Sequence, residues 1–492
     1  MSSSAVPSAT PQARVWLALL LTAVAAVLFF RLGESPVDVT AEHRVDVVMR
    51  TMVASGDWLV PRMGDELRLQ KPPLSYWLSA GLAELGLGPT PLALRMPSAL
   101  AGLLLVLLCF RWGLRLGGGG LGLLAAGLLA AMQSFVALGR RGVAEMLLAA
   151  ACTAVFLLWP ELVDRRRRGM LPLFALCVTI AFLAKATAAL FVLALPIAVD
   201  LWLRGAWREA LRWRNSRWIA LALLLGFAWW GAIALRGGEA REQLVQIALL
   251  PLGIQGAEVE ASARHYRPWY FFLSVLPQAA SPAIALAMLF ASRRAWPRLR
   301  ALPAEQRWPW IVVLAIFVGF SALPQKQKHY LLPMLPALAL VLAQTARRML
   351  ADNPDSAARW LRLFALLLGA LGSVAIAVIG AAYGICLPGG LPIALAMVGV
   401  GASLVALAIH AAWRGDALRF ARCGIAFVLG FWLVWEDGID HRLRQWRAGE
   451  LQDPAWRTAI ERADVWVDIP KEGSDPREEI PPALRDLEER AR

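Results

Sequence analysis

Long apolar runs dominate this chain and constrain its fold more than any other feature. A helix needs about 20 residues to cross the hydrocarbon core of a bilayer, and hydropathy indicates about thirteen such runs. With 58% hydrophobic residues over 492 positions, a soluble domain could not bury so much apolar surface. The sequence therefore predicts an all-α polytopic membrane protein. The predicted spans lie near 13–32, 92–112, 118–137, 142–160, 171–186, 187–203, 217–235, 269–291, 309–323, 329–345, 361–384, 390–413 and 418–436.

Short basic segments between these runs indicate the orientation. If the spans alternate, four such segments fall on one side, which the positive-inside rule makes the cytoplasm: 164–168, 204–217, 292–300 and 346–350. We then expect a cytoplasmic N-terminus and outer loops at 33–91 and 236–268. Loop charge of this kind explains the net charge of +14, so we expect no nucleic-acid partner.

The chain divides into one large unit and a tail. We interpret residues 1–436 as a transmembrane domain and 437–492 as a short periplasmic tail. Arg14 followed by an uncharged run resembles a signal peptide, but no small-residue cleavage site follows, so we interpret it as a retained first helix. The five cysteines form no CxxC or Cys/His cluster, which argues against a disulfide framework and against structural zinc.

Lysine is rare enough here to be informative. Only five of the 50 basic side chains are lysines. Lys71, Lys185, Lys326 and Lys328 all lie in, or at the end of, segments expected to face outward, against the positive-inside bias. Chance is one explanation of this pattern. The other is a group of point charges at an outer cavity, which suits a phosphate ligand.

Several short motifs occur in the same order as in a known family. They include ASGDWLVP (54–61), KPP (71–73), LRMPSAL (94–100), GRRGVAEMLLA (139–149), LAK (183–185), HYRPWYFFL (265–273) and KQKHYLLPMLPALAL (326–340). On these motifs residues 13–345 resemble the polyprenyl-phosphate-sugar glycosyltransferases of GT-C fold, both aminoarabinose-transferase-like and protein O-mannosyltransferase-like. The resemblance implies a GT-C-like bundle whose first outer loop carries juxtamembrane helices.

The resemblance also implies a sugar donor carried on polyprenyl phosphate. Its leaving group is a phosphate, so catalysis needs fixed positive charge where negative charge develops. Two adjacent prolines remove two N–H donors and stiffen the loop that presents Lys71. The expected lipid-phosphate ligands are Lys71, Arg44, Arg267 and Lys326, with Arg140 or Arg141 behind them and Tyr330 as a hydrogen-bond donor.

The family's acidic positions are altered in this chain. Its acidic pair Asp-Glu aligns with Ala41 and Glu42, and its second acid, an aspartate, is Glu145 here. We expect Glu42 and Glu145 to be catalytic bases that open into one cavity with Lys71; the alternatives are that Glu42 caps a juxtamembrane helix and that Glu145 pairs with a nearby arginine. Asp38 or Asp46 could replace the missing acid.

A metal site is implied only weakly. The family's metal-ligand candidate ahead of KPP is Gln70 here, whereas His265 matches the outer-loop histidine. A single histidine without a partner carboxylate rarely binds a metal. A divalent cation at His265 is therefore possible, and no cofactor is required by the sequence.

Three functions remain open from the sequence. The first is a glycosyltransferase of the bacterial inner membrane, with a periplasm-facing site and lipid A, a glycan or a protein as acceptor. The second is a GT-C relative that lost its base at Ala41 and binds or hands on a lipid-linked sugar. A transporter is disfavoured, because transporters place polar residues near the midplane and contain internal repeats.

Overall fold

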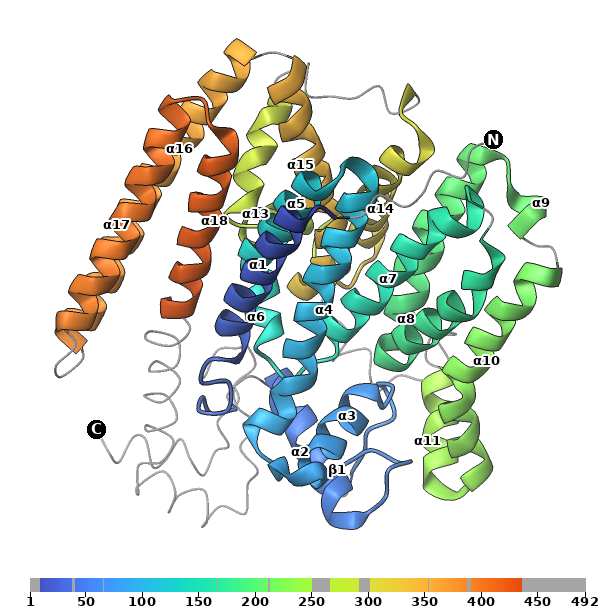
Figure 1. The fold of residues 1–492 in the computed structure, drawn as a ribbon. Helices are drawn as coiled ribbons and strands as arrows, with labels where there is room; N and C mark the ends of the chain where they lie inside the picture. The colour runs from blue at the N-terminus through green and yellow to red at the C-terminus, as the bar shows by residue number, and fades with distance from the viewer. Residues whose placement is uncertain are drawn as a thin grey trace.

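The structure is a computed structural model, and it describes residues 9–37, 40–64, 66–165, 167–210, 213–249, 266–291, 301–352, 354–386 and 391–435. These residues form a long helical bundle with a smaller group of elements at one end (Figure 1). The predicted tail, 437–492, lies outside the described residues.

The bundle is built from α1 (Pro11–Phe29), α4 (Pro91–Gly117), α5 (Gly119–Ala131), α6 (Gln133–Gly139), α7 (Glu145–Val163), η2 (Arg168–Met170), α8 (Leu171–Arg204), α9 (Trp207–Ala210), α10 (Trp213–Arg236), α13 (Phe271–Ala279), η4 (Ala283–Ala291), α14 (Ala304–Ala322), η7 (Lys328–Met334), α15 (Leu335–Asp352), α16 (Pro354–Cys386), α17 (Leu391–Trp413) and α18 (Ala417–Val434). The group at one end contains α2 (Thr40–Ser55), β1 (Arg62–Met63), β2 (Glu66–Leu67), α3 (Leu74–Leu82), the π-helical η1 (Ala83–Leu87) and α11 (Gly238–Leu249).

Membrane-spanning helices account for most of the bundle. Nine helices of the described residues are long and apolar enough to cross a bilayer, or ten if the bent pair α5 and α6 is one span. The all-α polytopic architecture is therefore confirmed, whereas the count of about thirteen stays a prediction. The predicted span 118–137 is broken at Met132, where α5 and α6 meet at 67°. The predicted span 269–291 is the short helix α13 followed by the 3-10 helix η4.

Helix α8 is a hairpin of two limbs. Trp159 of α7 contacts Phe174, with ring centroids 6.3 Å apart, and its indole Nε1 donates to Asp200 Oδ2 at 2.8 Å. A straight helix would hold Phe174 and Asp200 roughly 39 Å apart. The chain must therefore reverse between them, at Lys185, whose backbone is non-helical. The prediction of separate spans at 171–186 and 187–203 agrees with these two limbs.

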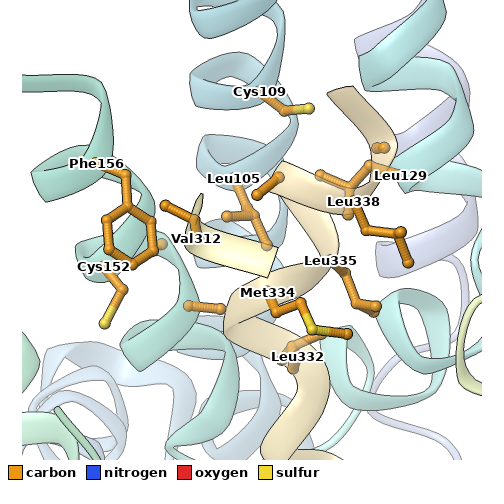
Figure 2. Close-up of a cluster of buried hydrophobic side chains, with 14 of the residues drawn as sticks. Leu105, Cys109, Leu129, Cys152, Phe156, Val312, Leu332, Met334, Leu335 and Leu338 are labelled. Carbon is orange, nitrogen blue, oxygen red and sulfur yellow. The ribbon is translucent and has the colours of Figure 1, made fainter. Parts of the chain in front are cut away.

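The core of the bundle surrounds α15. In its most apolar window, which runs from η7 into α15, 83% of the residues are buried, against 17% for α18, so α15 is central and α18 peripheral. Figure 2 shows Met334 of η7 and Leu335 and Leu338 of α15 among side chains of α4, α5, α7 and α14. Large-to-small changes in such a core remove dispersion contacts that lipid cannot replace.

The two ends of α7 carry opposite kinds of site. Near its C-terminus, buried Glu161 pairs with Arg165 at 2.6 Å, Arg115 at 3.2 Å and Arg167 at 3.4 Å. Arg165 also pairs with Glu305, and Arg204 with Asp164. Two of the predicted basic segments, 164–168 and 204–217, therefore meet at one end of the bundle, whereas 292–300 lies outside the described residues. Glu145 begins the same helix, roughly 24 Å from Glu161 at the other end.

The first predicted outer loop folds into a compact layer at the Glu145 end. Helix α2 is amphipathic: Val45, Val48, Met49 and Met52 recur at helical spacing and pack on Tyr76 of α3. The strands β1 and β2 pair antiparallel, and Gly64 supplies the positive φ that the turn between them requires. The juxtamembrane helices expected in residues 33–91 are present as α2 and α3.

Candidate active site

A partly enclosed cavity lies at the N-terminus of α7. About 250 Å³ of space there is unfilled by atoms, part of it open to solvent, and side chains of α7, α8, α14 and η7 line it. Its polar lining residues are Glu145, Lys185, His329 and Tyr330, and its apolar ones are Leu148, Ala188, Val192, Phe320 and Pro333. One end of the cavity is thus charged while the rest is hydrocarbon.

Glu145 is the electrostatic centre of the charged end. Its Oε1 lies 2.9 Å from Lys185 Nζ and 3.2 Å from His329 Nε2. Lys185 Nζ also lies 3.4 Å from His329 Nε2 and 5.1 Å from the centroid of the Tyr330 ring, a cation–π distance. As the first residue of α7, Glu145 also benefits from the positive end of the helix dipole. Its carboxylate is therefore stabilised as an anion.

Lys71 approaches this cluster from the first outer loop. Its pKa is lowered to about 8, chiefly by desolvation on burial and also by the neighbouring cations Lys185, Arg68 and Arg44, while Glu145 opposes the shift. Arg68 and Arg44 also lie near Tyr76, whose pKa burial raises. Buried Lys71 thus lies near three other cations, an environment that favours an anionic ligand.

The stretch from Gly56 to Lys71 is held so that Lys71 faces this cluster. Asp57 accepts N–H bonds from Leu59 and Val60, and its carboxylate pairs with Arg236 of α10 at 2.8 Å. The indole of Trp229 on α10 donates to Leu59 O at 2.8 Å. Helix α3 then begins at Leu74, three residues after Lys71, with Pro73 in the N-cap position. The loop is therefore anchored to α10 on one side of Lys71 and to α3 on the other.

The structure contradicts the prediction that Glu42 opens into the cavity with Lys71. Glu42 is fully buried, and Arg95 donates to both of its carboxylate oxygens, at 2.7 and 3.1 Å. Its Oε1 also accepts the backbone N–H of Gly142 at 2.7 Å. Both oxygens are engaged within the protein, so Glu42 cannot face an acceptor hydroxyl.

Three other predicted phosphate ligands donate hydrogen bonds to backbone carbonyls. Arg140 donates to the Val27 and Phe30 carbonyls at the C-terminal end of α1. Lys326 is buried and its ammonium donates to the carbonyls of Arg267, at 3.0 Å, and of Leu323. Exposed Arg267 donates to the Tyr266 carbonyl. The predicted convergence of Lys71, Lys326 and Arg267 is therefore wrong for Lys326, because backbone carbonyls occupy its ammonium.

The remaining predicted residues lie near the cluster, pair elsewhere or fall outside the described residues. Tyr330 lines the cavity and Arg44 lies near Lys71, as predicted. Asp46 pairs with Arg50 at 2.9 Å. His265 and Asp38 lie outside the described residues. Within the described ranges, no group of three metal-ligating side chains occurs, so a metal at His265 stays a prediction.

Sequence reasoning did not assign Arg68 or His329 to the site. Arg68 precedes Lys71 by three residues, and its Nε is buried without a protein partner. His329 directly precedes Tyr330, in a chain that has only five histidines. Lys185 was singled out as a rare lysine but not as a site residue. The scarcity of lysine and histidine is therefore a signal that could have identified Lys185 and His329, but it could not have identified Arg68.

The lowered pKa of Lys71 predicts a pH dependence. Below about pH 8 the free protein carries the Lys71 ammonium, and as pH rises through that value the charge is lost. A phosphate monoester is already fully ionised there, since its second pKa is about 6. We expect the affinity for a lipid phosphate to fall about fivefold from pH 8 to 9, measured by tryptophan fluorescence titration in nanodiscs. Lys71→Arg should remove the fall, because guanidinium stays protonated.

Comparison with known proteins identifies proteins of similar sequence and similar fold. A family model described as dolichyl-phosphate-mannose-protein mannosyltransferase matches residues 70–230. The solved structure of ArnT from Cupriavidus metallidurans bound to undecaprenyl phosphate superposes with a TM-score of 0.66 at 20% identity, over 91% of this chain and 81% of that one. The chain has the ArnT fold. The resemblance to this family seen in the motifs is thus confirmed.

Curated relatives with the ArnT-type activity align over much of the chain. An undecaprenyl phosphate-alpha-4-amino-4-deoxy-L-arabinose arabinosyl transferase of Pseudomonas aeruginosa is 28% identical over 73% of this chain and 64% of its own length. The corresponding protein of Aeromonas salmonicida is 28% identical over 86% of this chain and 79% of its own length. The chain therefore spans just under two thirds of the length of the first relative and more of the second.

Proposed function

We propose that this protein is a membrane glycosyltransferase that takes its sugar from a polyprenyl-phosphate carrier. The observation that carries the proposal is the position of Lys71, whose ammonium lies among Arg44, Arg68 and Lys185 with Glu145 as the opposing charge. A lipid phosphate would interact favourably with these cations. The relatives named for transfer from undecaprenyl phosphate support this reading.

The lining of the cavity has the chemical character that a ligand with a charged head and an apolar tail requires. The phosphate would lie at the end formed by Lys185 and Tyr330, near Lys71, and the apolar lining residues Leu148 and Val192 would face the first isoprene units. Water has little access to such a lining, which strengthens each electrostatic contact with the phosphate.

The chemistry assigned to these residues is nucleophilic displacement at the anomeric carbon. The acceptor hydroxyl oxygen bonds to that carbon while the carbon–oxygen bond to the phosphate breaks, and the phosphate leaves with the electron pair. Lys71 and Lys185 would stabilise the charge that grows on the phosphate. Glu145 would accept the hydroxyl proton and stabilise positive charge on the sugar ring.

The proposal also places the protein in the bacterial inner membrane with its site facing the periplasm. Orientation rests on the arginine segments that meet at the Glu161 end, opposite Glu145. We propose an aminoarabinose-like sugar with lipid A, a glycan or a protein as acceptor. Lipid A and surface glycans of a deletion strain should lack one sugar by mass spectrometry, and the wild-type gene should restore it.

A second candidate is supported by Ala41. That position lacks the family's aspartate, and Glu42 beside it is engaged by Arg95. A protein that binds or hands on the lipid-linked sugar would need the Lys71 cluster but no base. An unchanged glycan profile in the deletion strain, together with donor binding by the purified protein, would favour this candidate over the transferase.

A further inference from the structure

Three contacts hold the turn that leads into Glu145. The backbone N–H of Gly142 donates to Glu42 Oε1 at 2.7 Å, and the Val143 carbonyl accepts from Ser98 Oγ of α4 at 2.8 Å. The guanidinium of Arg140 donates to the Val27 carbonyl of α1 at 2.6 Å. The turn between α6 and α7 is therefore joined to α1, α2 and α4.

Arg95 links this turn to the rest of the first outer loop. Besides both oxygens of Glu42, its guanidinium donates to three backbone carbonyls between α1 and α2, at 2.8 to 3.0 Å: Leu32, Ser35 and Pro36. Arg95 and Glu42 are both almost completely buried, at 1% and 0% exposed. Removing one partner of such a buried pair would leave an uncompensated charge away from water, which is strongly destabilising.

The turn also packs directly on α4. A Cβ atom at Gly142 would lie 2.4 Å from Leu94 Cγ, so only glycine allows this approach. Leu94 immediately precedes Arg95 in the chain. The position of Glu145, three residues after Gly142, is thus set by the same segment of α4 that carries the buried arginine.

We propose that Arg95 and Glu42 are positioning residues, which hold the turn 139–144 and through it place the Glu145 carboxylate against Lys185 and His329. The expected effect on catalysis rests on the proposed function, whereas the effect on the position of the turn 139–144 does not. Glu42 would then act through the backbone of Gly142 and never touch the substrate. A displaced Glu145 would lose alignment with the acceptor while Lys71 still bound the donor phosphate.

The decisive variant removes both charges together. Arg95→Met with Glu42→Leu replaces the buried pair by apolar side chains, a change that proteins often tolerate without unfolding. We expect kcat to fall on the order of a hundredfold, the usual cost of a misplaced reactive group. The KM for the donor should stay within about threefold, because the Lys71 cluster is intact. A kcat within threefold of wild type would overturn the proposal.

Two further variants separate positioning from folding. The Glu42→Gln variant keeps an acceptor oxygen for Gly142 and should retain most of the wild-type kcat. The Arg95→Lys variant should lose kcat, because lysine cannot reach the Leu32, Ser35 and Pro36 carbonyls together. The matched control is Arg31→Gln, which removes an exposed ion pair with Glu34 in the same segment and should leave kcat unchanged. Equal losses in all three would contradict the proposal.

Amide hydrogen exchange provides a readout that does not need activity. In the double variant the amides of 139–145 should exchange at least tenfold faster, while those of α4 and α15 keep wild-type protection. If wild-type protein shows no transfer, the proposed function fails, and this exchange pattern still decides the positioning inference. Unchanged protection of 139–145 would refute it.

Discussion

Lys71→Met should lower kcat/KM for the lipid-linked donor by on the order of 10²–10³, because one fixed charge at the leaving phosphate is lost. In the free protein, burial lowers the pKa of Lys71 to about 8. A bound phosphate would offset the repulsion that Lys71 experiences from Arg68 and Arg44. The same variant should bind undecaprenyl phosphate much more weakly in a nanodisc titration. Methionine retains the length of the stem, so the packing of the loop is preserved.

Lys328→Met is the matched control for that experiment. Lys328 is another of the few lysines and begins η7, but its side chain is exposed. The Lys328→Met variant should bind the donor and turn it over like the wild-type protein, since an exposed charge is screened by solvent. Donor affinity within twofold of wild type in Lys71→Met would remove Lys71 from the phosphate site and with it the observation on which the transferase proposal rests.

Glu145→Gln should reduce transfer by on the order of a hundredfold or more, the scale of lost general-base help. Glutamine has nearly the same shape but cannot accept the hydroxyl proton. The change also removes the negative charge that Lys185 and His329 share, at 2.9 and 3.2 Å. Donor affinity should therefore rise while turnover falls, and single-turnover kinetics with donor titration would show both.

Opposite shifts in affinity and turnover distinguish a base from a structural acid. A merely structural Glu145 would weaken binding and turnover together when it is replaced. Glu84→Gln serves as the control, because Glu84 is an exposed acid in η1 and should change neither quantity. Retained transfer in Glu145→Gln would move the base to Asp46 or Asp38, the two acids that flank Ala41.

Much of the fold could be predicted because bilayer thickness acts on local sequence. An apolar run of span length must be helical to satisfy its backbone in lipid, so α1, α4, α7, α10, α16, α17 and α18 fall within a few residues of the predicted spans. The segment 269–291 could not be resolved this way. Its apolar character is span-like, yet it forms a short α-helix and a 3-10 helix, and hydropathy is the same for either.

The candidate site was predicted only in part. Lys71, Glu145, Arg44 and Tyr330 were chosen by motif and by the scarcity of lysine, and they do lie around one cluster. Lys326 looked equivalent to Lys71 in sequence, since both are rare lysines on an outward segment. It is not equivalent, because the chain between Leu323 and Lys326 turns its ammonium onto backbone carbonyls.

The sequence by itself determined the polytopic helical architecture and the charge that a ligand must carry, since hydropathy and residue type are properties of the chain alone. The tertiary structure alone decided which charge meets which. Glu42 and Glu145 are both acids at the start of a helix, yet one is enclosed by Arg95 and Gly142 and the other lines the cavity. Contacts between residues distant in sequence depend on how helices pack, and no local pattern encodes them.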